Sequence, residues 1–206
     1  MRATIHRQVE AYYTAKVQRH GPTPAGVDWN GAASQQVRFR QLLRVCPEGQ
    51  RFSLLDYGCG YGALWGWLGE QGIACDYRGF DLSPRMIEAA RSLYGESPSC
   101  RFVLTEDELA PADVCVASGI FNVKQDRPTG EWEAYVLETI ARLDRLGTRG
   151  FAFNLLTSYS DPEKMRPDLY YGDPCALFDH CKRRYGRNVA LLHDYDLYEF
   201  TLLVRK

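Results

Sequence analysis

The sequence predicts an α/β fold with a doubly wound, mostly parallel sheet of seven strands that helices cover on both faces. Apolar runs of strand length alternate with helical segments along most of the chain, which is typical of parallel strands joined by crossover helices. The apolar run that ends at Asp56 passes directly into a glycine-rich turn, as a buried strand that leads into a helix would. A short turn separates the last two strand segments, so we expect the last strand to run antiparallel.

The N-terminal part is predicted to be helical and to fold over the sheet as a lid. One helix is expected over residues 3–19, followed by a loop rich in proline and glycine that contains Trp29. Ser34 is expected to cap a second helix that ends near Val45, because a serine oxygen satisfies free amides of the first turn.

The rest of the chain is predicted to alternate strands with helices. Strands are expected at 52–56, 77–81, 101–105, 113–118, 149–155, 188–193 and 198–204. Helices are expected at 63–71, 84–94, 131–146 and 174–185. Ser83 and Pro84 mark the start of the helix expected at 84–94, since serine is a preferred cap and proline a preferred first helical residue. Residues 157–173 are expected to form a long polar and aromatic loop.

Length and charge are typical of one soluble domain. The chain of 206 residues is predicted to be a single domain, with N-terminal helices and lid over 1–46 and a core over 47–206. A net charge of −1 gives no footprint for nucleic acid or an anionic membrane, so we expect neither as a partner. The basic run 182–184 is interpreted as a solvated helix face, and a monomer or a homodimer is expected.

The cysteine pattern predicts a reducing compartment. The seven cysteines are odd in number, form no CxxC pair, and several fall inside predicted strands, which favours buried reduced thiols. No apolar stretch has the length of a leader peptide or a membrane span, so a cytoplasmic location is expected.

A glycine turn follows the first strand and is the clearest functional signal. Gly58, Gly60 and Gly62 alternate behind Asp56, and glycine lets a backbone turn tightly and approach a ligand closely. The helix predicted to begin near Ala63 points its free amides into the same space. The sequence therefore predicts a cradle of nucleotide size.

Further polar residues are predicted at the ends of the neighbouring strands. Asp81 ends the second strand, where a carboxylate can accept hydrogen bonds from ribose hydroxyls. Glu106 and Asp107 end the third strand, and either can receive an adenine amino group. Ser118 and Gly119 end the fourth, where small residues leave room for a base or a sulfur-bearing chain.

Together these segments resemble the motifs of class I S-adenosylmethionine (SAM)-dependent methyltransferases. "LLDYGCGYG" (54–62) is similar to the first motif and "FDLSPRMIEAAR" (80–91) to the second, with Asp81 in the ribose-binding position. "FVLTEDEL" (102–109) and "ADVCVASG" (112–119) are similar to the third and fourth. The resemblance covers about residues 53–119. It implies a Rossmann-like sheet of strand order 3-2-1-4-5-7-6, SAM as cofactor and S-adenosylhomocysteine (SAH) as product.

The resemblance also implies a set of cofactor-binding residues at the carboxyl ends of the strands. We expect these to be Asp56, Tyr57, Gly58, Cys59, Gly60, Asp81, Leu82, Met86, Glu106, Asp107, Ser118 and Gly119. Cys59 is expected to serve by being small. Arg38 or Arg40 is a further candidate, as a partner for the methionyl carboxylate of the cofactor.

The acceptor is predicted to be a small molecule methylated at oxygen or nitrogen. Family members that act on nucleobase or amide nitrogens carry Asn/Asp-Pro-Pro-aromatic after strand four, whereas this chain has 118–121 as Ser-Gly-Ile-Phe. His193 is the candidate base for a hydroxyl proton, and Asn122 and Lys124 are candidates to hold the acceptor. Only Asn154 stands where metal-dependent members gather acids, so we expect no metal.

Aromatic residues are concentrated in the predicted lid and in the loop 157–173. Tyr12, Trp29, Tyr159 and Tyr170 are expected to bind the substrate, and such rings suit a flat or cationic acceptor.

Other functions remain open from the sequence alone. The fold can bind SAM without methyl transfer, as a regulatory or scaffold protein, or it can use SAM for cyclisation or aminopropyl transfer. A nicotinamide dehydrogenase is the last alternative, because its glycine turn is usually spaced differently and lacks the leading acid.

Overall fold

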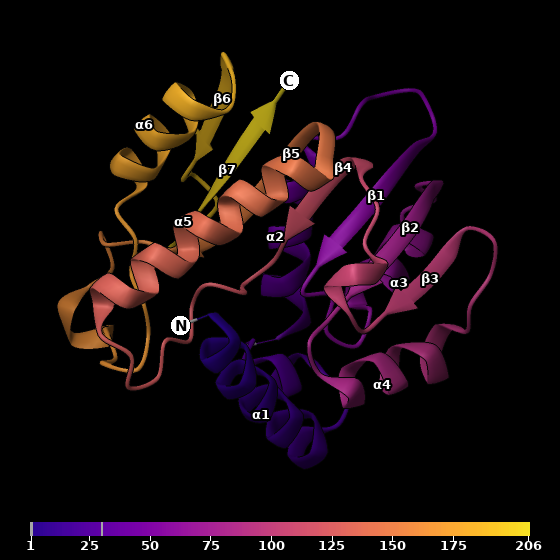
Figure 1. The fold of residues 1–206 in the computed structure, drawn as a ribbon, viewed down its shortest axis with the longest axis horizontal. Helices are drawn as coiled ribbons and strands as arrows, with labels where there is room; N and C mark the ends of the chain where they lie inside the picture. Colours follow the sequence, from indigo (N-terminus) through magenta and orange to yellow (C-terminus); the bar gives the residue numbers. More distant parts are fainter. Residues whose placement is uncertain (1, 30) are drawn as a thin grey trace.

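The computed structural model describes residues 2–29 and 31–206, and the sheet in it has seven strands in the order β3-β2-β1-β4-β5-β7-β6. The strands are β1 (Phe52–Tyr57), β2 (Cys75–Phe80), β3 (Cys100–Val103), β4 (Ala112–Ala117), β5 (Gly147–Leu156), β6 (Asn188–Leu192) and β7 (Glu199–Arg205). β1 to β5 pair in parallel, and β7 runs antiparallel to both β5 and β6. The predicted Rossmann-like fold and its implied strand order are therefore confirmed (Figure 1).

Helices cover the sheet on both faces (Figure 1). They are α1 (Arg2–His20), α2 (Ala32–Leu43), α3 (Ala63–Glu70), α4 (Pro84–Tyr94), α5 (Thr129–Leu146) and α6 (Pro174–Arg184), with short 3₁₀ turns η1 (Pro24–Val27), η2 (Glu106–Glu108) and η3 (Pro162–Lys164). One core cluster joins α5 and α6 to the sheet, and a second joins α2, α3 and α4 to it. These two apolar layers are what doubly wound strands require, because the central strands are buried on both sides.

Most elements begin and end within a few residues of the predicted positions, and one cap differs. Ser83 caps α4 as predicted: its side chain accepts a hydrogen bond from the amide of Met86. The predicted cap of α2 by Ser34 is wrong. That helix begins at Ala32 behind Gly31, and the Ser34 hydroxyl donates to the carbonyl of Gly31 at 2.9 Å.

α1 lies across the carboxyl-end side of the sheet, beside α4 (Figure 1). Ile5 is fully buried in the core cluster of α5 and α6, and Val17 is buried with Tyr61 and Met86. The hydroxyls of Thr14 and Ser83 lie 2.7 Å apart, which fixes α1 to the first turn of α4. The N-terminal helix thus covers the strand ends, as the predicted lid requires.

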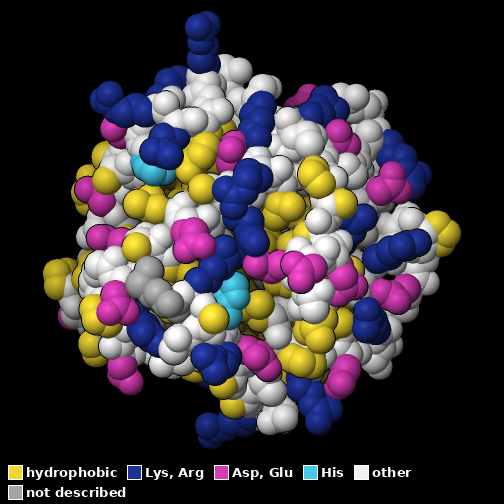
Figure 2. Space-filling model, viewed as in Figure 1, with side chains coloured by type: hydrophobic (Ala, Val, Ile, Leu, Met, Phe, Trp, Pro, Cys, Tyr) yellow, Lys and Arg dark blue, Asp and Glu magenta, His cyan; other side chains and the backbone are white. Residues whose placement is uncertain are grey.

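The surface shows charges of both signs side by side. Lys, Arg, Asp and Glu side chains are interspersed over the face in Figure 2, and many are paired, such as Arg85 with Glu88 and Arg183 with Asp179. Over the described residues, no helix combines the length and the hydropathy needed to cross a bilayer.

Candidate active site

The glycine turn wraps around the end of β2. The amides of Gly58 and Cys59 both donate to the carbonyl of Phe80, at 2.7 and 2.8 Å, and the amide of Gly60 donates to Asp81 Oδ2 at 2.9 Å. Gly58 and Gly60 have φ of +87° and +55°, a region that residues with a Cβ enter only at a cost. The first motif and Asp81 therefore form one hydrogen-bonded unit.

Asp81 is held by backbone amides on both of its oxygens. Oδ2 accepts from Gly60 and Oδ1 accepts from the amide of Ser83 at 2.9 Å. Burial raises the pKa of Asp81 to about 6, although these amide bonds pull it down. Each oxygen keeps a second acceptor position, so the carboxylate can still receive hydroxyl groups of a ligand.

Asp56 lies deeper, at the end of β1. Its side chain is buried and accepts a hydrogen bond from the hydroxyl of Tyr77 at 2.8 Å. Burial raises the pKa of Asp56 to about 7, against the lowering effect of the Tyr77 bond. A cation bound above this carboxyl would favour its charged form.

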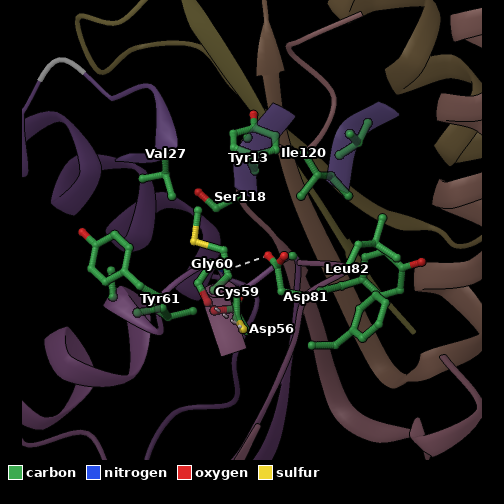
Figure 3. Close-up of a pocket in the computed structure, with 18 of the residues that line it drawn as sticks. Tyr13, Val27, Asp56, Cys59, Gly60, Tyr61, Asp81, Leu82, Ser118 and Ile120 are labelled. Atoms are coloured by element: carbon green, nitrogen blue, oxygen red, sulfur yellow. Dashed lines mark hydrogen bonds between the residues drawn. The ribbon is translucent and has the colours of Figure 1, made fainter. Parts of the chain in front are cut away.

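A cavity with about 880 Å³ of empty space, part of it open to solvent, lies above these residues. Figure 3 shows Gly60 and Asp81 on one side of it, with Tyr13 and Ile120 opposite. Its floor comes from the strand ends and includes Asp56, Gly58, Gly60, Asp81, Ser118 and Gly119. Tyr57, Cys59, Leu82 and Met86 also line it. The structure thus brings together ten of the residues that the sequence assigned to the cofactor.

A SAM-sized donor fits this floor on two structural grounds. A Cβ on Gly58 would stand 2.3 Å from Ile120 Cγ2, and one on Gly60 would stand 3.2 Å from Val27 Cγ1, so the close packing of this lining depends on the two glycines. The hydroxyl oxygen of Ser118 is buried at the cavity wall without a hydrogen-bond partner among the described residues. Such an atom is expected to bind an ordered water or a ligand. Burial raises the pKa of the Cys59 thiol well above its usual value, so this residue lines the turn as a neutral group.

The N-terminal segment covers the cavity, and we call the residues Glu10, Tyr13, Val27 and Trp29 its roof. A Cβ on Gly119 would stand 2.3 Å from two atoms of the Trp29 ring, which means that the indole packs directly on the end of β4. Trp29 was predicted to bind substrate and does lie at the cavity. Glu10 and Val27 were not predicted, because no local motif marks them in α1 and η1.

A buried chain of polar contacts supports Trp29 from behind. Its ring stacks on the Arg38 guanidinium, 3.9 Å from ring centre to Cζ. Arg38 donates two hydrogen bonds of 2.8 Å to Glu199, which also accepts from Asn154 Nδ2 at 2.9 Å. Asn154 Oδ1 in turn accepts from the amide of Gly119 at 2.7 Å. Arg38 is thus paired with Glu199 through Nε and Nη2, while its buried Nη1 has no hydrogen-bond partner among the described residues.

Glu106 and Asp107 do not line the cavity. Glu106 forms ion pairs with Arg2 at 2.6 Å and Arg142 at 2.9 Å and accepts a hydrogen bond from Tyr57. Asp107 is exposed on η2. The predicted contact with an adenine amino group therefore finds no support in this arrangement, because the Glu106 carboxylate is engaged by the two arginines.

The three residues expected to act on the acceptor also lie outside the cavity. The Asn122 side chain is buried and accepts from the amide of Leu156 at 3.2 Å. Lys124 donates to the carbonyls of Gln125 and Arg127 in its own loop. His193 is exposed and packs between the rings of Tyr159 and Phe200. Each has a structural role in its loop that explains its position.

The three tyrosines predicted to bind substrate do not line the cavity either. Tyr12 donates to Asp28 Oδ2 at 2.6 Å on the outer side of α1. Tyr159 is 68% exposed, and Tyr170 is buried with its hydroxyl 3.4 Å from Glu133. Tyr13 and Tyr135 line the cavity in their place. Burial raises the pKa of Tyr135 to about 12 and raises that of Tyr13 as well, so both hydroxyls are neutral donors and acceptors.

Comparison with known proteins independently indicates a methyltransferase domain. Residues 54–135 match a family described as "Methyltransferase domain". "Putative methyltransferase Rv1506c" of Mycobacterium tuberculosis (strain ATCC 25618 / H37Rv) is 51% identical over 164 residues, which cover 80% of this chain and 99% of that protein.

Two solved structures share the fold at low sequence identity. Magnesium protoporphyrin IX methyltransferase (ChlM) of Synechocystis PCC 6803 with bound SAM is 16% identical with a TM-score of 0.64, covering 98% of this chain and 97% of that one. The DhpI–SAM–HEP complex is 15% identical with a TM-score of 0.64, covering 95% of each chain.

Proposed function

The chain belongs to the methyltransferase-domain family and is a class I SAM-dependent methyltransferase. From this premise we propose that it methylates an oxygen or nitrogen of a small molecule. The observation that carries the proposal is a single cavity with a glycine floor on one side and a roof of side chains on the other. A cavity of this form holds a donor on the floor and leaves the roof for the acceptor.

We assign the donor to the floor. Asp81 would accept hydrogen bonds from the ribose hydroxyls, and the glycine turn would receive the methionine part close to its backbone. Ser118 has a free hydroxyl for the same ligand. When bound, SAM supplies a methyl group that its sulfonium has already activated.

The size and cover of the cavity favour a small acceptor. Donor and acceptor must share its empty space of about 880 Å³, part of which is open to solvent. α1 and Trp29 lie over the strand ends, where they would exclude water from the reacting groups. The chain's own contribution is then mainly to position the acceptor.

The chain provides no lining histidine to take a proton from the acceptor, among the residues that the structure describes. We therefore do not propose His193, Lys124 or Asn122 as catalytic groups. The carboxyls of Glu10, Asp56 and Asp81 are the ionisable acids that line the cavity. An acceptor that is already nucleophilic, or that loses its proton to a carboxylate, suits this lining best.

Methyl transfer in a cell extract tests the proposal. Purified protein is incubated with extract and SAM labelled in its methyl group, and the products are separated into small molecules, protein and nucleic acid. We expect label in the small-molecule fraction, with SAH formed in equal amount, and a reduction of both with Asp81→Ala. Label only in protein or nucleic acid, or no transfer at all despite SAH binding, would contradict the proposed acceptor class.

A further inference from the structure

The charge of the cavity lining is one-sided. Three carboxyl side chains line it, from Glu10, Asp56 and Asp81, and no lysine, arginine or histidine does so among the described residues. Arg38 packs on a roof residue without lining the cavity itself. It lies behind the Trp29 ring, and Glu199 binds it through two hydrogen bonds. A negatively charged acceptor would therefore meet acidic side chains on this lining and no cation there.

Glu10 differs from the other two acids. Asp56 accepts from Tyr77, and Asp81 accepts from the amides of Gly60 and Ser83, so both are tied to the floor. Glu10 has no hydrogen-bond or ion-pair partner among the described residues, and it belongs to α1 rather than to a strand end. Its carboxylate is thus available to a molecule that enters under the roof.

Aromatic rings line the same cavity as this carboxylate. Tyr13 is one turn further along α1, on the same side of the helix, and it lines the cavity as Trp29 and Tyr135 do. Rings attract cations through their faces and pack well against flat groups. A carboxylate with aromatic neighbours and no competing cation is a site for an ammonium or a similar organic cation.

We propose that the acceptor carries a positively charged amine and that Glu10 binds this group, which makes Glu10 the residue that selects the acceptor by charge. The inference rests on the proposed function, in that the cavity holds donor and acceptor together. It narrows the acceptor from any small molecule to an organic cation, and it excludes carboxylates and phosphates.

Binding of charge-matched probes tests the inference without requiring turnover. The protein is saturated with SAH, and calorimetry then measures binding of tyramine, 4-ethylphenol and 4-hydroxyphenylacetate, which share a ring and differ in charge. A second set of butylamine, butanol and butyrate repeats the comparison without a ring. We expect each cation to bind at least about tenfold more tightly than its anion, the scale of one favourable charge contact.

The variant Glu10→Gln keeps the shape of the side chain and removes its charge. We expect it to reduce the preference for the cations by about tenfold, while binding of SAH and of the neutral probes stays unchanged. Glu70→Gln, at the exposed end of α3, is the matched control and should keep the full preference.

The outcomes separate this inference from the function on which it depends. If SAH itself does not bind, the proposed function fails. If SAH binds but no cation is preferred over its anion, or if Glu10→Gln keeps the preference, the inference about Glu10 is overturned and the methyltransferase remains.

Discussion

The floor and the roof of the cavity are built in different ways. The floor comes from 54–119, where Asp56, the glycine turn, Asp81 and Ser118 stand at the ends of neighbouring parallel strands. The roof comes from α1 and from residues 24–29, which reach the site because α1 packs on α4 and Trp29 packs at the end of β4. A ligand-binding floor can thus be encoded by short motifs, whereas a roof depends on contacts between distant parts of the chain.

The largest effect on the free energy of unfolding is expected at the buried ion pair behind the roof. Glu199→Ala leaves the Arg38 guanidinium, only 6% exposed, without its partner behind Trp29. Removing one member of a buried ion pair typically costs about 3–5 kcal/mol of unfolding free energy. Urea unfolding should show a loss of this size, and the exposed control Glu163→Ala should show almost none. A loss below about 1 kcal/mol would mean that the polar contacts between Arg38, Glu199 and Asn154 do not stabilise the roof.

The acids of the floor are expected to make the free energy of unfolding depend on pH. The pKa of Asp56 is raised to about 7 from the 3.8 of a free carboxyl, so the folded state keeps a proton that the unfolded chain loses. The free energy of unfolding should therefore fall as pH rises from about 4 to 7, by on the order of 3 kcal/mol for this group. Asp81, whose pKa is raised to about 6, adds a contribution of the same sign.

The variant Asp56→Asn isolates the Asp56 contribution. Its amide oxygen can still accept the bond from Tyr77, but the side chain no longer titrates. Urea unfolding at several pH values should show that the variant gains stability over the wild type as pH rises through this window. Parallel pH profiles for the two proteins would show that Asp56 is not held protonated by burial.

Cofactor affinity should distinguish floor acids from acids outside the cavity. Asp81→Ala removes a charged hydrogen-bond partner, and we expect SAH binding in calorimetry to weaken by about 1–3 kcal/mol. Asp81→Asn, which keeps one acceptor oxygen, should lose less. Asp107→Ala should bind SAH like the wild type, since Asp107 is exposed on η2. A strong effect at Asp107 would restore the sequence-based expectation of an adenine contact.

The smallest effect is expected at His193. The side chain is exposed beside Tyr159 and does not line the cavity, so His193→Ala should change kcat/KM by less than about threefold. Steady-state kinetics with the acceptor found in extract provides the measurement. A large loss of kcat with unchanged KM would identify His193 as a base that reaches the acceptor in a closed state.

The fold could be predicted almost completely from the sequence, and so could the floor. The strand order was implied by the resemblance to class I methyltransferases. The position of Asp81 follows from a motif whose residues are neighbours in sequence, because strand ends meet at one edge of the sheet. The cap of α2 was missed because Gly31 takes that position, and a glycine cap leaves no side-chain signal.

The roof could not be predicted in the same detail. Glu10 and Tyr13 face the cavity only because α1 docks on α4, where Thr14 meets Ser83, and nothing in the sequence of α1 indicates that contact. The expectation that tyrosines of the loop 157–173 bind the substrate also depended on packing that the sequence does not reveal. Tyr170 is drawn inward, since its backbone amide donates to the carbonyl of Asn122 at 2.8 Å. Aromatic residues in a loop predict a pocket only when the packing of that loop is known.

A crystal structure of the protein with SAH tests the central claim most directly, that the glycine floor with Asp81 binds the donor. We expect the ribose hydroxyls within about 3 Å of the Asp81 carboxylate, with the sulfur under Trp29 and Tyr13. SAH bound elsewhere on the protein, or a ribose that leaves Asp81 bonded only to Gly60 and Ser83, would contradict the account.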